Sequence, residues 1–97
     1  MKKNIYQIDI TPLLNKEGQD ISGDEHIIFD FECHDDLKEI LNRVGVIDGL
    51  TTQQTQSFAI GLKMLGEVML ENRKHPLFAE FSPHFGQFMK TLKQSIK

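Results

Sequence analysis

The chain opens on a segment in which apolar and polar side chains alternate with a period of two residues. Between residues 4 and 11, Tyr6, Ile8 and Ile10 fall on one face and polar residues fall on the other. This alternation is typical of a half-buried β-strand. Pro12 ends the strand because proline has no N–H group to donate to a ladder.

A second alternating run follows a polar loop that covers residues 15–23 and contains two glycines. In residues 26–32, Ile27, Phe29 and Phe31 share the face that we expect to point inward. The two runs are expected to pair antiparallel, as a hairpin over about residues 4–33. Because a two-stranded hairpin is only marginally stable alone, its apolar face has to pack against helices or against another copy of the sheet.

The periodicity then becomes helical and predicts three main helices, at about residues 35–44, 52–72 and 83–96. Asp36 with Glu39, and Thr51 with Gln54, have the spacing of capping boxes at the starts of the first two helices. Gly45 is expected to end the first helix as a C′ glycine. The sequence therefore predicts a single α+β domain over residues 1–97: an antiparallel two-stranded hairpin followed by three main helices, with the long helix central.

Two prolines shape the approach to the last helix. Pro76 pushes His75 out of the helical region and is expected to start a short turn. Ser82 and Pro83 resemble an N-cap followed by a proline at the first helical position. The apolar positions of this helix form an ordinary amphipathic stripe that consists of Phe85, Phe88, Met89, Leu92 and Ile96.

The middle helix is apolar around most of its circumference. At about 100° per residue its apolar positions cover roughly 240°, far more than the stripe that a surface helix needs. Lys63, Glu67 and Glu71 form a charged face, yet Ile60 falls between the two glutamates and Met64 falls just beyond them. A helix with so wide an apolar arc has to be covered on several sides.

Three explanations of the wide arc remain open. The helix is the central pillar of a monomer, or a second subunit covers part of its face, or Ile60 is exposed singly, which is normal on protein surfaces. Gly61 and Gly66 each cost about 1 kcal/mol of helix stability relative to Ala, a cost that close approach of another backbone would offset. Because the hairpin also lacks a partner, we favour a homodimer whose interaction surface includes Ile60, Met64 and the exposed hairpin edge.

Composition excludes several classes of protein. The 97 residues are 39% hydrophobic and 26% charged, which is typical of a globular domain. Surface scaling gives about 5,700 Å² for the folded chain against about 16,000 Å² unfolded, so a core forms without a metal or a disulfide. No apolar run approaches the roughly 20 residues of a membrane span, and Met1, Lys2 and Lys3 do not open a signal peptide. The lone cysteine, Cys33, favours a cytoplasmic location.

Charge is distributed unevenly along the chain. Residues 1–36 carry three Lys against nine Asp or Glu, and residues 37–97 carry eight Lys or Arg against five Asp or Glu. Most of the acidic residues sit in turns or at helix starts, where a solvated rim explains them, although an acidic patch for a basic partner is an alternative. The net charge of −3 argues against a general binder of nucleic acid or of anionic membranes.

Two groups of residues resemble metal or catalytic sites. The first comprises His26, Cys33, His34, Asp35 and Asp36, but its spacing matches no zinc pattern, and Cys33 is expected to be a small inward-facing hydrophobe. The second comprises Glu67, Glu71 and His75, which recur every four residues as carboxylate and histidine ligands do in helical bundles. Here the facing Glu-x-x-His pairs are absent from the sequence, so a solvated charged face is the preferred interpretation. We therefore predict no catalytic residue, metal or cofactor.

Two further features of the sequence resemble nucleic-acid-binding elements, namely a glutamine-rich helix start and a series of phenylalanines. Gln53, Gln54 and Gln56 near the start of the middle helix could contact bases in a helix-turn-helix, but the connection between the helices is too long and flanking positive charge is missing. The phenylalanines that follow, spaced by three and four, are expected to be core residues: Phe78, Phe81, Phe85 and Phe88.

Three stretches of the chain resemble a bacterial family of small proteins whose domain has no known function. They are residues 58–70 continuing through 73–78, residues 34–37, and residues 88–93. The similarity extends over nearly the whole chain. It implies a compact stand-alone bacterial protein, and it assigns no activity, cofactor or catalytic residue to any position.

The residues and the resemblance together favour a small non-enzymatic interaction protein that acts as a homodimer, with another protein partner as a further option. Membrane binding is not expected, and nucleic-acid binding is disfavoured by the acidic pI of about 5.7. The alternatives are a small-molecule or metal-dependent enzyme and a DNA-binding regulator.

Overall fold

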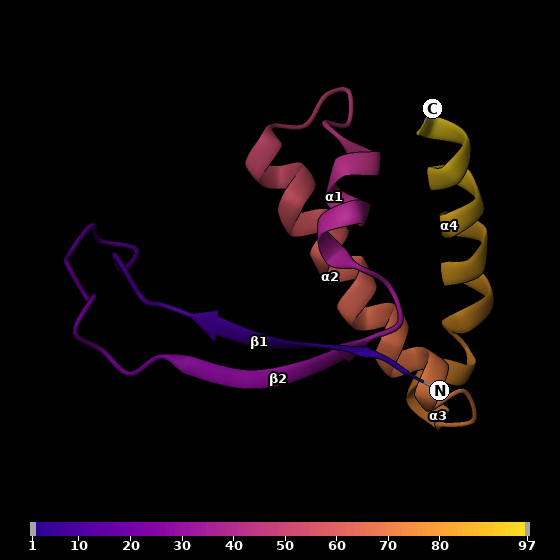
Figure 1. The fold of residues 1–97 in the computed structure, drawn as a ribbon, viewed down its shortest axis with the longest axis horizontal. Helices are drawn as coiled ribbons and strands as arrows, with labels where there is room; N and C mark the ends of the chain where they lie inside the picture. The colour runs from indigo at the N-terminus through magenta and orange to yellow at the C-terminus, as the bar shows by residue number, and fades with distance from the viewer. Residues whose placement is uncertain (1, 97) are drawn as a thin grey trace. The chain divides into compact units, whose positions relative to one another are not determined.

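The computed structural model describes residues 2–96. Its elements in chain order are β1 (Asn4–Ile10), β2 (Ile27–Cys33), α1 (Leu37–Val44), α2 (Thr52–Glu71), α3 (Pro76–Ala79) and α4 (Ser82–Ser95) (Figure 1). The predicted α+β architecture is confirmed, with an antiparallel hairpin, three main helices and one additional short helix, α3. The chain divides after His34 into two compact units, the hairpin unit and the helical unit.

In the hairpin unit, β1 and β2 pair antiparallel, as the sequence predicts. Tyr6 lies opposite Phe31, Ile8 opposite Phe29, and Ile10 opposite Ile27. Because opposite residues of an antiparallel pair project on the same side, these six side chains form one continuous apolar ladder. The shared face is therefore confirmed.

Burial of this ladder differs from the expectation at its loop end. Phe31 is buried and Ile8 is half-buried, but Ile10, Ile27 and Phe29 are 51%, 59% and 41% exposed. The prediction that the second run points inward is thus wrong for Ile27 and Phe29. The reason is that alternation determines which side chains share a face, whereas burial of that face requires another element to pack against it.

The polar loop between the strands is ordered by its own side chains. The Asn15 carboxamide oxygen accepts from the backbone N–H groups of Glu17 and Gln19 at 3.0 and 2.9 Å. A carboxylate oxygen of Asp20 accepts from the Ser22 hydroxyl at 2.7 Å and from the Ser22 backbone N–H at 2.8 Å. These bonds, the hydroxyl first, lower the pKa of the Asp20 carboxyl because they favour its charged form.

In the helical unit, α1 begins and ends as its sequence signals predict. The Asp36 carboxylate accepts from the backbone N–H groups of Lys38 and Glu39 at 2.9 and 3.3 Å, so it caps the helix. Gly45 follows the last turn with φ +63°, a conformation that costs glycine little. Its N–H donates to the Leu41 carbonyl.

Helix α2 is a single continuous helix of 20 residues, and neither of its glycines breaks it. Thr51 and Gln54 form the predicted capping box, with both reciprocal bonds at 3.0 Å. Thr55, one turn later, is 1% exposed, and its hydroxyl accepts from the Ile47 backbone N–H at 3.2 Å. That bond ties the connection before α2 to the helix itself.

The start of α4 differs from the prediction. The His75 ring Nδ1 accepts from the Leu77 backbone N–H at 3.1 Å and caps α3. Ser82, expected as the N-cap of the last helix, is its first helical residue, because Phe81 already has a helical conformation. The chain thus passes from α3 into α4 almost without leaving helical geometry.

The described part of the chain buries few large side chains. Its buried apolar residues are Phe31, Cys33, Leu37, Ala59 and Met69. The accessible surface is 7842 Å², compared with about 5,700 Å² expected for one compact chain and about 6,800 Å² for two separately compact pieces of these lengths. The total accessible surface is therefore larger than either value.

Candidate functional site

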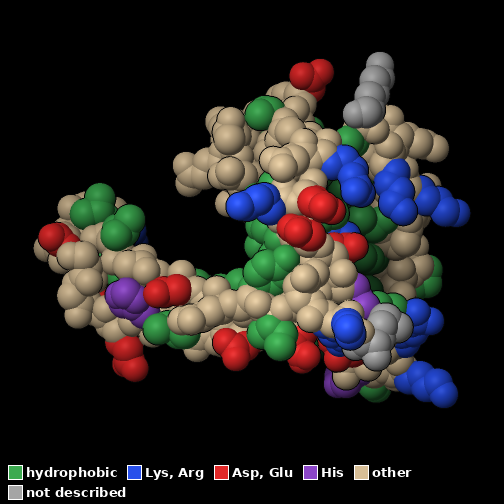
Figure 2. Space-filling model, viewed as in Figure 1, with side chains coloured by type: hydrophobic (Ala, Val, Ile, Leu, Met, Phe, Trp, Pro, Cys, Tyr) green, Lys and Arg blue, Asp and Glu red, His purple; other side chains and the backbone are tan. Residues whose placement is uncertain are grey.

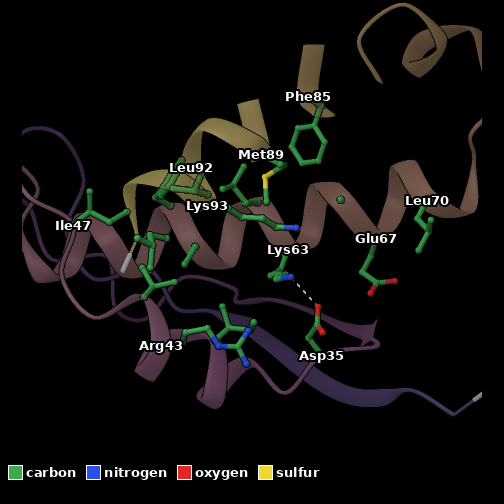
Figure 3. A pocket seen from close by; sticks show the side chains of 17 residues that line it. Asp35, Arg43, Ile47, Lys63, Glu67, Leu70, Phe85, Met89, Leu92 and Lys93 are labelled. Carbon is green, nitrogen blue, oxygen red and sulfur yellow. Dashed lines mark hydrogen bonds and ion pairs between the residues drawn. The ribbon is translucent and has the colours of Figure 1, made fainter. Parts of the chain in front are cut away.

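The helical unit contains a cavity of about 400 Å³ bounded by α1, α2 and α4 (Figure 3). Its walls are mostly apolar and include Ile40, Val44, Phe58, Leu62, Met89 and Leu92. Helical spacing brings these residues together, since each helix presents the stripe that its sequence predicts. The last helix thus uses its apolar stripe to form one wall of a cavity.

Three cationic side chains line the same cavity, and each comes from a different helix. Arg43 belongs to α1, Lys63 to α2 and Lys93 to α4, and Figure 3 shows the Lys63 ammonium directed at Asp35. The Lys63 ammonium lies 2.8 Å from a carboxylate oxygen of Asp35, in a pair whose side chains are 29% and 48% exposed. Within residues 2–96, Arg43 and Lys93 have no ion pair.

The charged face of α2 is less solvated than the sequence suggested. Glu67 is only 7% exposed and Lys63 is half-buried, and both line the cavity, whereas Glu71 is exposed. The interpretation of a solvated face is therefore wrong for Glu67 and incomplete for Lys63. The reason is that α1 packs against α2, and Lys63 pairs with Asp35 just before the start of α1.

The opposite face of α2 is apolar and partly exposed. We call it the outer face and define it by Ile60, Met64, Leu65 and Val68, none of which lines the cavity. Ile60 and Met64 are half-buried, and Leu65 and Val68 are 37% and 47% exposed. The wide apolar arc thus divides into a cavity face and an outer face.

The two glycines of α2 have different surroundings. A Cβ atom built on Gly66 would lie 3.8 Å from the Phe85 ring, an ordinary contact. Apart from its two chain neighbours and the nearby backbone of its own helix, no atom of the described chain would lie within 4 Å of a Cβ on Gly61. Gly61, at helical spacing from Leu65 and Val68, therefore has open space beside it.

The phenylalanines are only partly buried. Phe58 and Phe88 meet edge to face with ring centroids 6.0 Å apart, and Phe81 and Phe85 are 5.9 Å apart. Phe81 and Phe88 are nevertheless each 44% exposed. The expectation of a core cluster is thus wrong for these two rings, neither of which lines the cavity.

The residues that resembled a metal site have separate structural roles. His26 Nδ1 lies 3.0 Å from Asp9, Asp35 pairs with Lys63, and Asp36 caps α1. Cys33 is buried, as its position on the strand predicts. Across residues 2–96, no three His, Cys, Asp or Glu side chains are grouped so that they could hold a metal ion.

The second sequence group is not brought together either. Glu67 is buried at the cavity, Glu71 is exposed, and His75 caps α3. Of the three glutamines near the start of α2, Gln54 is used in the capping box and the other two are exposed.

Sequence reasoning missed Arg43 and Lys93 as members of one site. Both occupy the last turn of their helices, where cations are explained by the helix dipole. No spacing rule links two residues 50 positions apart, so only the packing of three helices shows that both line one cavity.

The hairpin unit carries mainly acidic side chains, whereas most Lys and Arg residues belong to the helical unit. Acidic residues outnumber lysines by seven to three in residues 1–34, and Lys and Arg gather over the helices in Figure 2.

As for membranes, none of the helices within residues 2–96 combines the length and the apolar character that crossing a bilayer demands.

Comparison with known proteins gives a family but no activity. Residues 4–94 match the model of a family described as a domain of unknown function with a solved structure, DUF3861. The chain is similar to a protein of unknown function from Pectobacterium atrosepticum whose crystal structure is known, with 42% identity and a TM-score of 0.81 over 96% of this chain and 99% of the other. No curated protein matches. The chain therefore belongs to the DUF3861 family of domains of unknown function.

Proposed function

We propose that this protein is a non-enzymatic interaction protein of the bacterial cytoplasm that acts as a homodimer. The observation that carries the proposal is the exposed apolar surface, which comprises the outer face of α2 and the loop end of the hairpin ladder. Exposed apolar groups scattered singly are normal, but contiguous patches mark surfaces for association. The lone buried Cys33 suits a reducing compartment.

The amount of uncovered surface supports association with a second copy. The accessible area exceeds the value for two separately compact pieces by about 1,000 Å². A standard stable interface buries about 800 Å² on each partner. A second copy that covers the outer face together with neighbouring exposed residues would remove part of this excess.

The geometry of the outer face is suited to a twofold contact. Ile60, Met64 and Val68 follow each other at intervals of four residues along one side of α2, so two copies can pack their stripes antiparallel. Gly61 lies beside this stripe with open space around it. A small residue at that point lets a second helix approach closely.

The test is the mass of the protein in solution, measured by light scattering and sedimentation over a range of micromolar concentrations. We expect a dimer for the natural chain and a monomer for Val68→Lys, which places a charge in the centre of the outer face. Gln87→Lys is the matched control, because Gln87 is exposed on α4 and belongs neither to the outer face nor to the lining of the cavity. It should remain dimeric.

A natural chain that stays strictly monomeric at high micromolar concentration contradicts the proposal. So does an equal effect of the two lysine substitutions, because the dimer would then not depend on the outer face. Circular dichroism spectra of both variants establish that each is folded.

A further inference from the structure

The cavity between α1, α2 and α4 is separate from the outer face of α2 and has the features of a small-ligand site. Its volume of about 400 Å³ lies within the range of about 300–1,000 Å³ that is usual for such sites. Helices bound it on three sides, and Phe58, Leu62 and Met89 contribute to its apolar wall. An apolar group that enters it leaves water at a gain of about 0.8 kcal/mol per methylene.

The charges at the cavity favour an anion. Its lining contains the cations Arg43, Lys63 and Lys93 and the carboxylates Asp35 and Glu67. Asp35 already pairs with Lys63 at 2.8 Å, and Glu67 is buried and also has a polar partner. Arg43 and Lys93 are left without an ion pair in the described chain.

We propose that this cavity binds a small anionic amphiphile, an alkyl carboxylate whose chain occupies the apolar part and whose carboxylate meets Arg43 and Lys93. Guanidinium and ammonium groups form strong charge-assisted bonds with carboxylates. Since the two cations come from α1 and α4, the ligand links helices that otherwise frame an open space (Figure 3). The site goes beyond the proposed dimer and does not depend on it.

Decanoate is the probe, used below the concentration at which it forms micelles. In isothermal titration calorimetry we expect saturable binding, and in thermal unfolding a rise of the midpoint by mass action. Octanoate, which lacks two methylenes, is expected to bind about fifteenfold more weakly. Butyrate should not bind, because it lacks the chain, and decyltrimethylammonium should not bind, because its charge is opposite.

Two charge reversals on the same helix locate the site. Lys93→Glu is expected to weaken decanoate binding about tenfold, since attraction becomes repulsion. Lys90→Glu is the matched control, because Lys90 is exposed on α4 and does not line the cavity. It should bind decanoate as the natural chain does.

Three results would overturn the proposal. One is the absence of decanoate binding, and another is equal binding of decyltrimethylammonium. The third is dissociation of a dimer by decanoate together with a monomeric Lys93→Glu variant, which would assign the cavity to the contact with a second copy. The proposed dimer is tested separately, by the Val68→Lys variant, so a failure of decanoate binding does not affect it.

Discussion

At the scale of single residues, most polar side chains that could be ligands instead complete the hydrogen bonding of the backbone. Asp36 and His75 cap helices, and Asn15 orders the hairpin loop. These roles follow from the orphan N–H groups at helix starts and in turns, which a nearby oxygen or ring nitrogen satisfies. A cluster of such residues in the sequence is therefore weak evidence for a metal.

Thr55 is the residue at which such a bond matters most for stability. Its hydroxyl is fully buried and accepts from the Ile47 N–H at 3.2 Å. Thr55→Val keeps the volume but removes the acceptor, so we expect the free energy of unfolding to fall by about 1–3 kcal/mol. Urea denaturation measures this change in the free energy of unfolding.

Thr52→Val is the control, because Thr52 is exposed at the start of the same helix. Its effect should be no more than about 0.5 kcal/mol. Equal losses at both positions would show that the Thr55 hydroxyl contributes nothing beyond helix propensity.

At the scale of elements, the starts and ends of α1 and the start of α2 could be predicted to within two residues. Asp36, Gly45 and the Thr51–Gln54 capping box act through backbone groups within a turn of themselves, so their effect is present in the sequence. The start of α4 was displaced by one residue because α3 leads directly into it. Arg43 and Lys93 could not be predicted as one site, since their proximity depends on how three helices pack.

Glycine substitutions test how open the surface of α2 is. With no atom within 4 Å of a Cβ at Gly61, Gly61→Ala is expected to stabilise the monomer by about 1 kcal/mol through helix propensity alone. The measurement is urea denaturation in the Val68→Lys background, which removes the proposed dimer. A loss of stability there would mean that the chain itself covers Gly61.

Gly45→Ala is expected to change the free energy of unfolding in the opposite direction under the same conditions. Its surroundings are equally open, but φ is +63°. Alanine is strained in that conformation, so we expect a loss of about 1 kcal/mol. The pair of substitutions separates backbone conformation from packing.

At the scale of the whole molecule, the accessible surface of 7842 Å² is the property that most needs an explanation. A chain of 97 residues has a small ratio of core to surface even when it is compact. Exposed Ile27, Phe29 and Val68 reduce that ratio further. Stability that the chain does not gain internally can come from a second copy or from a ligand.

The thermal midpoint is therefore expected to depend on protein concentration. If unfolding is coupled to dissociation of a dimer, a hundredfold dilution lowers the midpoint, whereas a monomer unfolds at the same temperature throughout. Differential scanning fluorimetry over that range decides between the two. In the Val68→Lys variant the midpoint should be independent of concentration.

The sequence by itself determined what local interactions decide: two alternating strands, capped helices and an unbroken α2. Only the tertiary structure decided which apolar faces are covered, how the arc of α2 divides into a cavity face and an outer face, and that Arg43, Lys63 and Lys93 line one cavity. Periodicity specifies which side chains share a face. Which of these faces is buried, and which side chains line one cavity, depends on contacts between residues far apart in the chain. Such contacts exist only once the helices have packed.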